Sequence, residues 1–414
     1  MTLRRNDMKK ILTTLICMLL VTVMVYAQSS MDKLLSHSGI ERNKVAVMVV
    51  DINTDSTLLA HNIEGPLVPA SVMKAITIAS TISSTGIDYR YVTRIYMVGA
   101  LVGEELQGDL LIIGGGDPSL NARSGPQSGD IVDECVNALI RKGVKRITGD
   151  IKVNQTIFPG PATVPSWAKE DLKYGYGAGC YGLNFENNSY LKGSQSYSMS
   201  NPAATLSRRI KEACAERGVT FEAKQNDAEG QRTLLLEHRS ATIDEIMRHC
   251  MQVSDNLYAE TLLRTLALSK GEEASTQNGI AIEKEMWRAH GLDFKGVTLI
   301  DGSGLSRSNR MTAKFLAGVL KHASDNADYA SFFPLAGQEG TLAKFLKDTP
   351  LDSYIALKTG SMRGIQCYAG YMLDDDYVPT HVVVMMINDF TCDRSTVRSL
   401  CEEVLLEVFN NSNN

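Results

Sequence analysis

The chain has 414 residues, of which 44% are hydrophobic and 21% are charged, and its formal net charge is -5 at pH 7. That length suggests two or three structural domains rather than one. The acidic balance excludes nucleic acid as the main partner and allows at most peripheral contact with a membrane, because it provides no polybasic surface.

The first 27 residues have the pattern of a secretory signal peptide. Two basic pairs precede an apolar run over residues 11–26, and Val25 and Ala27 stand at the -3 and -1 positions of a cleavage site. The run is shorter than the ~20 residues that a membrane-spanning helix needs, so cleavage is favoured over a retained anchor. We therefore expect an exported, periplasmic protein that starts near Gln28.

Cysteine and histidine usage gives no sign of a metal site. Removal of the leader would take Cys17 with it and leave seven cysteines, an odd number that cannot all pair within the chain. No two of them have C-x-x-C spacing, and the seven histidines include no H-E-x-x-H motif. We expect neither a metal nor a cofactor.

The first chemically suggestive pair is Ser71 and Lys74. Residues 44–51 and 56–61 predict a β-hairpin, and residues 72–83 predict a buried helix that begins beside Ser71. Residues three apart on a helix share a face, about 5–6 Å apart at Cβ. The helix dipole and burial would both lower the pKa of Lys74 and make it a base for the Ser71 hydroxyl. The alternative is a polar pair that caps a surface helix.

The Ser-x-x-Lys pattern alone is not specific, because it occurs four times. The other three copies begin at Ser30, Ser166 and Ser189, and none of them opens an apolar helix. Context therefore selects Ser71.

Residues 91–237 predict an inserted α+β domain. Strands are expected at 110–113, 151–153 and 233–236, and helices at 131–142 and 204–217. The run from Gly114 to Pro118 has the glycines of a phosphate loop, but no Gly-Lys-Ser/Thr follows and the proline breaks the chain. We interpret it as a turn.

A second polar motif, Ser254-Asp255-Asn256, lies where the chain should return from the insertion. Ser254 could relay a proton to a leaving group, and Asn256 could bind a substrate amide. Ser-x-Asn also occurs at Ser119, Ser324 and Ser412. Helix capping is the alternative role, since serine and asparagine favour caps.

The third motif, Lys358-Thr359-Gly360, occurs once, at the end of a strand predicted over residues 354–359. The lysine with the hydroxyls of Thr359 and Ser361 suits a substrate carboxylate, and Gly360 leaves room for substrate backbone. The backbone N–H groups of Ser71 and Ser361 could form an oxyanion hole. The alternative is an ordinary turn at a strand end.

Two further strands, at 365–373 and 381–388, and a helix at 394–409 complete the chain. With the N-terminal hairpin they predict one five-stranded antiparallel sheet flanked by helices. The corresponding domain would be discontinuous, with residues 28–90 and 238–414 around the insert at 91–237. Because both ends of the chain contribute strands to this domain, loss of the C-terminal helix should unfold the whole domain.

The three motifs together are the signature of penicillin-binding proteins and class A β-lactamases. The sequence more closely resembles the class C low-molecular-mass penicillin-binding proteins, the D-alanyl-D-alanine carboxypeptidase/endopeptidases, over most of the mature chain. Its distinctive stretches are Gly108-Asp109-Leu110, residues 114–120, Asp301-Gly302-Ser303-Gly304-Leu305-Ser306-Arg307 and Ala369-Gly370-Tyr371.

The resemblance implies an α/β (α+β) fold of the DD-peptidase/β-lactamase type and an acyl-enzyme on Ser71. The implied catalytic residues are Ser71, Lys74, Ser254, Asn256 and Lys358, and the implied substrate-binding residues are Thr359, Gly360, Ser361 and Asp171. The implied partners are peptidoglycan stem peptides, with β-lactams as covalent inhibitors. Asp171 would bind the amino group of a diamino acid; the alternative is a surface-turn carboxylate. The stretch 191–202 is too short for the third domain that many members carry.

Two other functions remain open from the sequence. A β-lactamase on the same scaffold would need a deacylating carboxylate, and the sequence does not place one. A non-enzymatic wall-binding protein would be expected to have lost Ser71 or Lys74.

Overall fold

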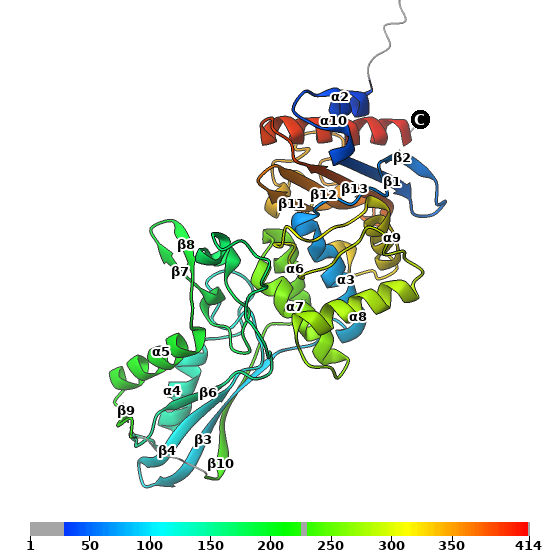
Figure 1. The fold of residues 1–414 in the computed structure, drawn as a ribbon. Coiled ribbons are helices and arrows are strands. Elements are labelled where there is room, and N and C mark those ends of the chain that lie inside the picture. Colours follow the sequence, from blue (N-terminus) through cyan, green and yellow to red (C-terminus); the bar gives the residue numbers. More distant parts are fainter. Residues whose placement is uncertain (1–28, 225–229, 413–414) are drawn as a thin grey trace, which may run out of the picture.

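The computed structural model describes residues 29–224 and 230–412, so the predicted signal peptide lies outside the described residues. The fold has two parts, a larger one that contains both ends of the described chain and a smaller one that extends from it (Figure 1). Within these described ranges, no helix has both the length and the apolar character needed to cross a membrane.

The larger part is built on the five-stranded antiparallel sheet that the sequence predicts. Its strand order is β11-β12-β13-β1-β2. β1 pairs with β13 from Val45↔Ile387 to Asp51↔His381, which joins the two ends of the chain in the middle of the sheet. The strands are β1 (Val45–Asp51), β2 (Thr57–His61), β11 (Ile355–Met362), β12 (Ile365–Leu373) and β13 (Pro379–Asn388).

Two helices cover one face of this sheet, α2 (Ser30–Ser36) and α10 (Arg394–Ser412). The central strands are apolar on both sides because both faces are covered. The core on this face is formed by side chains from α2, the sheet and α10, among them Leu34, Val45, Val47, Met385, Val397, Cys401 and Leu405. The helix expected at 394–409 is confirmed.

The other face carries a helical layer. Its central helix, α3 (Met73–Thr85), is buried from Met73 to Ile82, as expected for residues 72–83. The other helices of the layer are α6 (Ile243–Val253), α7 (Asn256–Ser269), α8 (Thr276–Ala289) and α9 (Ala313–Ala323).

The smaller part has its own sheet, with strand order β10-β3-β4-β5-β9 and β6 paired to β4. Its helices α4 and α5 contribute Ile131, Leu139, Leu206 and Ile210 to a separate apolar core. The strand β3 was not predicted, because Arg94 and Gly99 interrupt its apolar pattern. The elements are β3 (Val92–Val102), β4 (Glu105–Ile113), α4 (Ile131–Arg141), β5 (Arg146–Ile147), β6 (Ile151–Asn154), α5 (Pro202–Glu216), β9 (Thr220–Phe221) and β10 (Arg232–Arg239).

The segment between β6 and α5 returns toward the larger part. It contains short 3-10 turns at Asp171–Lys173 and Gly175–Gly177 and a hairpin of β7 (Ser189–Lys192) and β8 (Gln195–Ser198). The hairpin occupies the shortened stretch noted in the sequence. The domain boundaries at 90/91 and 237/238 stay a prediction.

Candidate active site

Ser71 lies in a single 3-10 turn, Ala70–Val72, that leads directly into α3. Ala70 before it has φ 48°, a left-handed conformation that costs a residue with a Cβ about 1 kcal/mol or more. Two glycines allow other segments to approach this turn. A Cβ on Gly304 would lie 1.9 Å from the Ala70 carbonyl oxygen, and one on Gly360 would lie 2.6 Å from that of Pro69. The strained turn is therefore held from two sides.

Lys74 is fully buried one helical turn after Ser71. Its ammonium nitrogen Nζ donates to Ser71 Oγ at 3.1 Å, to Asn256 Oδ1 at 2.6 Å and to the Ser303 carbonyl oxygen at 2.8 Å. Burial lowers the pKa of Lys74 below its ordinary value, because the charged form loses hydration. The spacing of the motif thus brings together a hydroxyl and a lysine that loses its proton more readily than an exposed one.

Ser254 and Asn256 occupy the junction between α6 and α7. Ser254 ends α6 in a left-handed conformation, with φ 64°, and Asn256 begins α7 after Asp255. The Asn256 side chain accepts from Lys74 and donates through Nδ2 to the Tyr176 carbonyl oxygen at 2.8 Å. These two bonds fix the orientation of the amide. The helix junction therefore serves to aim two polar side chains at the start of α3.

The Lys358-Thr359-Gly360 motif lies within β11, which extends three residues beyond the predicted end at Thr359. The strand continues to Met362 because Lys358 to Met362 pair with Ala369 to Ile365 of β12. Alternation along the strand then separates the side chains. Lys358 and Gly360 face the helical layer, and Thr359 and Ser361 face the opposite way, into a cavity.

Lys358 is fully buried, like Lys74, and its Nζ donates to the Thr359 carbonyl oxygen at 2.8 Å. Burial holds the pKa of Lys358 well below its ordinary value, and the nearby positive charge of Lys74 lowers it further. Because the two buried lysines repel each other when both are charged, they titrate as a pair. Protonating both at once costs more free energy than protonating either one alone.

The loop from Asp301 to Asn309 contacts Lys74 through the Ser303 carbonyl oxygen. The sequence marked this loop as distinctive but assigned it no role. The Asp301 carboxylate is buried and accepts from the side chain of Trp167 at 2.8 Å, from the backbone of Ser306 at 2.6 Å and of Gly304 at 2.9 Å, and from Asn309 Nδ2 at 2.8 Å. One carboxylate thereby sets the shape of the loop.

Glu260, from α7, holds the same loop on its other side. Its Oε1 accepts from the backbone N–H groups of Gly302 at 3.1 Å and Ser303 at 2.8 Å. Burial, followed by the charge of Asp301, raises the pKa of Glu260 to about 7. The Ser303 carbonyl that accepts from Lys74 is therefore positioned by Glu260. A glutamate four residues after Asn256, in an otherwise apolar run, was the available sequence signal.

Asp171 lies in the 3-10 turn Asp171–Lys173 and is partly exposed. It accepts from the Tyr176 hydroxyl at 2.8 Å. Burial, followed by this hydrogen bond, raises the pKa of Tyr176 to about 12, so the phenol remains a donor. Because the Tyr176 carbonyl also binds Asn256, Asp171 is linked to the Ser71–Lys74 pair through Tyr176 and Asn256. Its part in binding stays a prediction.

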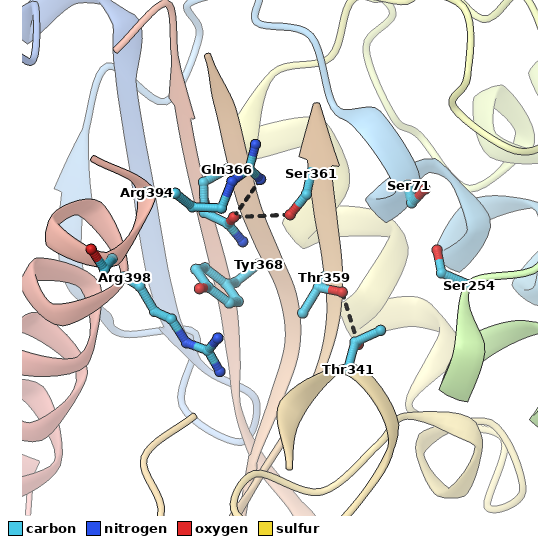
Figure 2. A pocket seen from close by; sticks show the side chains of 10 residues that line it. Ser71, Ser254, Thr341, Thr359, Ser361, Gln366, Tyr368, Arg394 and Arg398 are labelled. Carbon is cyan, nitrogen blue, oxygen red and sulfur yellow. Dashed lines mark hydrogen bonds between the residues drawn. The ribbon is translucent and has the colours of Figure 1, made fainter. Parts of the chain in front are cut away.

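A cavity of about 460 Å³ opens beside these motifs (Figure 2). Ser71 and Ser254 lie at one end, Thr359 and Ser361 in the middle, and Arg394 and Arg398 of α10 at the other end. The lining residues are Ser71, Ser254, Thr341, Thr359, Ser361, Gln366, Tyr368, Arg394, Ser395 and Arg398. Three motifs from distant parts of the chain therefore meet at one cavity.

The other copies of the short patterns lie elsewhere. Ser30 begins α2, Ser189 begins β7, and Ser324 follows α9. Ser166 comes nearest, since its hydroxyl is 2.7 Å from that of Ser306 on the 301–309 loop. Within the described ranges no group of three or more metal-ligating side chains occurs, and the seven cysteines there are unpaired thiols.

Comparison with known proteins places this arrangement in context. A model of the D-Ala-D-Ala carboxypeptidase 3 (S13) family matches residues 27–194 and 187–403. The chain is similar to a D-alanyl-D-alanine carboxypeptidase of Actinomadura sp. (strain R39), with 24% identity over 83% of this chain and 78% of the relative. It is also similar to the D-alanyl-D-alanine carboxypeptidase DacB of Haemophilus influenzae, with 24% identity over 80% of this chain and 83% of the relative.

A solved structure shows the same fold. It is penicillin binding protein 4 (dacB) from Haemophilus influenzae, with a TM-score of 0.77 and 22% identity over 92% of this chain and 98% of that chain. The expected DD-peptidase/β-lactamase-like fold is confirmed.

Proposed function

The chain belongs to the D-Ala-D-Ala carboxypeptidase 3 (S13) family, and we propose that it is a serine DD-peptidase that cleaves D-Ala-D-Ala ends or D-Ala cross-links of peptidoglycan. The observation that carries this proposal is the fully buried Lys74, whose Nζ lies 3.1 Å from the hydroxyl of Ser71 at the end of the cavity. We further propose that residues 28–90 and 238–414 form the catalytic domain, with 91–237 inserted, and that the protein acts outside the cytoplasm after export.

In the proposed acylation step, neutral Lys74 removes the proton of Ser71 Oγ as this oxygen attacks the carbonyl carbon of the penultimate D-alanine. The backbone N–H groups of Ser71 and Ser361 stabilise the oxyanion. When the tetrahedral intermediate collapses, Ser254 passes the proton from Lys74 to the departing amine. An ester on Ser71 and a free amine result.

In the proposed deacylation step, Lys74 accepts a proton from water as the water attacks the ester carbonyl. The released Ser71 oxygen recovers its proton, and the shortened peptide leaves with a new carboxylate. Asn256 holds the side chain of Lys74 throughout and is available to the substrate amide.

Thr359 and Ser361 are the proposed donors to the carboxylate next to the scissile bond. A carboxylate bound there adds a negative charge near Lys358 and favours its protonated form. Because Lys358 and Lys74 repel each other when charged, a proton on Lys358 favours a neutral Lys74. Substrate binding would thus help to prepare the base.

β-Lactams should acylate Ser71 and remain attached. In the described part of the chain, the cavity lining contains no carboxylate that could activate water against the ester. This observation supports a penicillin-binding enzyme over a β-lactamase, and the intact Ser71–Lys74 pair supports an enzyme over a binding protein.

Incubation of the purified protein with a labelled penicillin tests the proposal. We expect a stable covalent adduct in the wild type, none in Ser71→Ala, and an unchanged adduct in Ser30→Ala, which alters the serine of another Ser-x-x-Lys pattern. An adduct that persists in Ser71→Ala would refute the assignment. Rapid turnover of a chromogenic cephalosporin without an adduct would identify a β-lactamase.

A further inference from the structure

The two arginines at the far end of the cavity have no role in the proposed chemistry. Arg394 and Arg398 stand one turn apart at the beginning of α10, on the opposite side of Thr359 from Ser71 (Figure 2). Residues four apart on a helix share a face. Both side chains therefore border the space that a bound peptide would enter beyond Thr359.

Arg394 is tied to the turn between β11 and β12. Its guanidinium donates to the Met362 carbonyl oxygen at 2.7 Å, to that of Ile365 at 3.3 Å and to Gln366 Oε1 at 3.1 Å. Gln366 Oε1 also accepts from the Ser361 hydroxyl at 2.9 Å. Arg394 thus supports the strand that carries Ser361 and contributes a fixed positive charge.

Arg398 is different because its donors are not occupied. Its guanidinium lies 5.6 Å from the centre of the Phe345 ring. Among residues 29–224 and 230–412, no hydrogen bond or ion pair from Arg398 is found. Glu402, one turn further along α10, accepts from the Leu346 backbone N–H at 3.0 Å. The cation therefore borders the cavity without an anionic partner in the described chain.

This placement does not favour the stability of α10. Two like charges four residues apart on a helix repel each other, and a cation in the first turn, such as Arg394, opposes the helix dipole. An anion bound between the arginines and Thr359 would remove both penalties. A ligand carboxylate would give Arg398 the anionic partner that it does not have among the described residues.

The direction of the substrate identifies that ligand. If Ser71 holds the acyl carbon and Thr359 and Ser361 hold the carboxylate beside the scissile bond, the space next to α10 lies past the leaving residue. A terminal D-alanine ends at its carboxylate and does not extend further. The leaving half of a cross-link is a second stem peptide, which carries additional carboxylates.

Resting on the proposed function, we propose that Arg398, with Arg394 behind it, forms a subsite for a carboxylate on the leaving half of a cross-linked stem-peptide dimer. The enzyme then cleaves cross-links in preference to terminal D-alanine. Guanidinium groups suit this role, since they bind carboxylates through two parallel N–H donors.

The test compares two purified muropeptides, a disaccharide pentapeptide monomer and a cross-linked dimer, with the wild type, Arg398→Gln and Arg398→Lys. Arg288→Gln is the matched control, because Arg288 on the remote helix α8 is an arginine whose guanidinium also lies over a phenylalanine ring, 5.0 Å from the centre of the Phe294 ring. We expect Arg398→Gln to lower kcat/KM for the dimer about 10- to 100-fold and to leave the monomer within about threefold. Arg398→Lys should recover part of the loss.

A dimer in which every leaving-half carboxylate is amidated except the one beside the scissile bond identifies the recognised group. The wild type should lose activity on it to the same extent as Arg398→Gln loses on the free dimer, and the two changes should not add. If Arg398→Gln lost the same activity on monomer and dimer, or lost none on either, the subsite would be overturned. Penicillin labelling of Ser71 would still support the proposed function in that case. Failure of the wild type to bind penicillin or cut either substrate would instead refute the proposed function.

Discussion

The two faces of the five-stranded sheet differ in what they bury. The face under α2 and α10 is apolar, with a core of aliphatic and aromatic side chains. The face under the helical layer also buries six charged side chains, namely Lys74, Lys358, Glu260, Arg264, Asp301 and Glu283. Buried charges cost stability unless each is well paired. The contrast indicates that the face under α2 and α10 mainly stabilises the fold, with the cavity at its edge beside Thr359 and Ser361, and that the other face holds the buried charges of the site at a cost in stability.

Removal of residues 394–414 should have the largest effect on stability, because it exposes the apolar face of the sheet to solvent. Helix α10 buries Val397, Cys401, Val404, Leu405 and Val408. At about 1.5–3 kcal/mol each, their loss approaches the whole stability of a typical domain. We expect no cooperative unfolding transition by circular dichroism.

The matched control for the truncation is Glu403→Ala on the same helix. It removes only a half-exposed ion pair to Lys33, 3.1 Å long, and should cost at most about 1 kcal/mol. A truncated protein that melts cooperatively near the wild-type temperature would contradict the assignment of the stabilising face.

Lys74→Met should abolish most of the chemistry without unfolding the protein. The change removes the proposed base from Ser71 and should lower the rate of penicillin acylation by about 10³-fold. Stopped-flow or gel-based labelling measures this rate. Lys314→Met, which alters an exposed lysine paired with Glu64, should acylate at the wild-type rate. Normal acylation in Lys74→Met would remove Lys74 from the mechanism.

Asp301→Asn should loosen the loop that positions the Ser303 carbonyl. An amide nitrogen cannot accept the hydrogen bonds that the carboxylate receives, so about 3 kcal/mol of stability should be lost. Acylation should slow about tenfold, because Lys74 loses a fixed acceptor. Thermal unfolding and labelling measure the two effects. Asp293→Asn is the control, since its carboxylate is exposed and accepts from the Lys295 backbone.

Glu283→Gln should have the smallest effect on acylation, and its effect should appear instead in the pH dependence of stability. Neither oxygen of Glu283 has a hydrogen-bond partner among the described residues, and burial raises its pKa to about 8. The nearby Thr77 hydroxyl donates instead to the Gly302 carbonyl at 3.0 Å. Between pH 4.5 and 8 the folded protein therefore binds more protons than the unfolded chain, and stability falls as pH rises.

Denaturant titrations at pH 5 and pH 8 measure this dependence. The wild type should lose about 3 kcal/mol more than Glu283→Gln over that interval. Equal pH dependence in the two proteins would show that Glu283 is not a source of strain on the polar face.

Much of the fold followed from local pattern. The strands near both ends of the chain have long apolar runs, and the spacing of Ser71 and Lys74 requires them to share a helical face. The roles of Ser303 and Tyr176 could not be predicted, because each acts through a backbone carbonyl that has no signature in the sequence. β11 extends past Gly360 because these residues pair with β12, and the sequence of one strand does not show which residues of another strand it pairs with.

The local sequence pattern also could not predict which residues lie at the far end of the cavity. Arg398 lies 40 residues after Lys358 in the sequence, on a helix whose apolar face identified it only as a cover for the sheet. Its approach to Thr359 results from the packing of α10 across β11 and β12. Contacts of this kind depend on the whole fold.

The pH dependence of penicillin acylation tests the central claim most directly. If burial makes Lys74 the base for Ser71, the acylation rate should rise with pH through a midpoint below 10.5, the ordinary pKa of a lysine, and Lys74→Met should lack that rise. A midpoint at or above 10.5, or the same profile in Lys74→Met, would contradict the account.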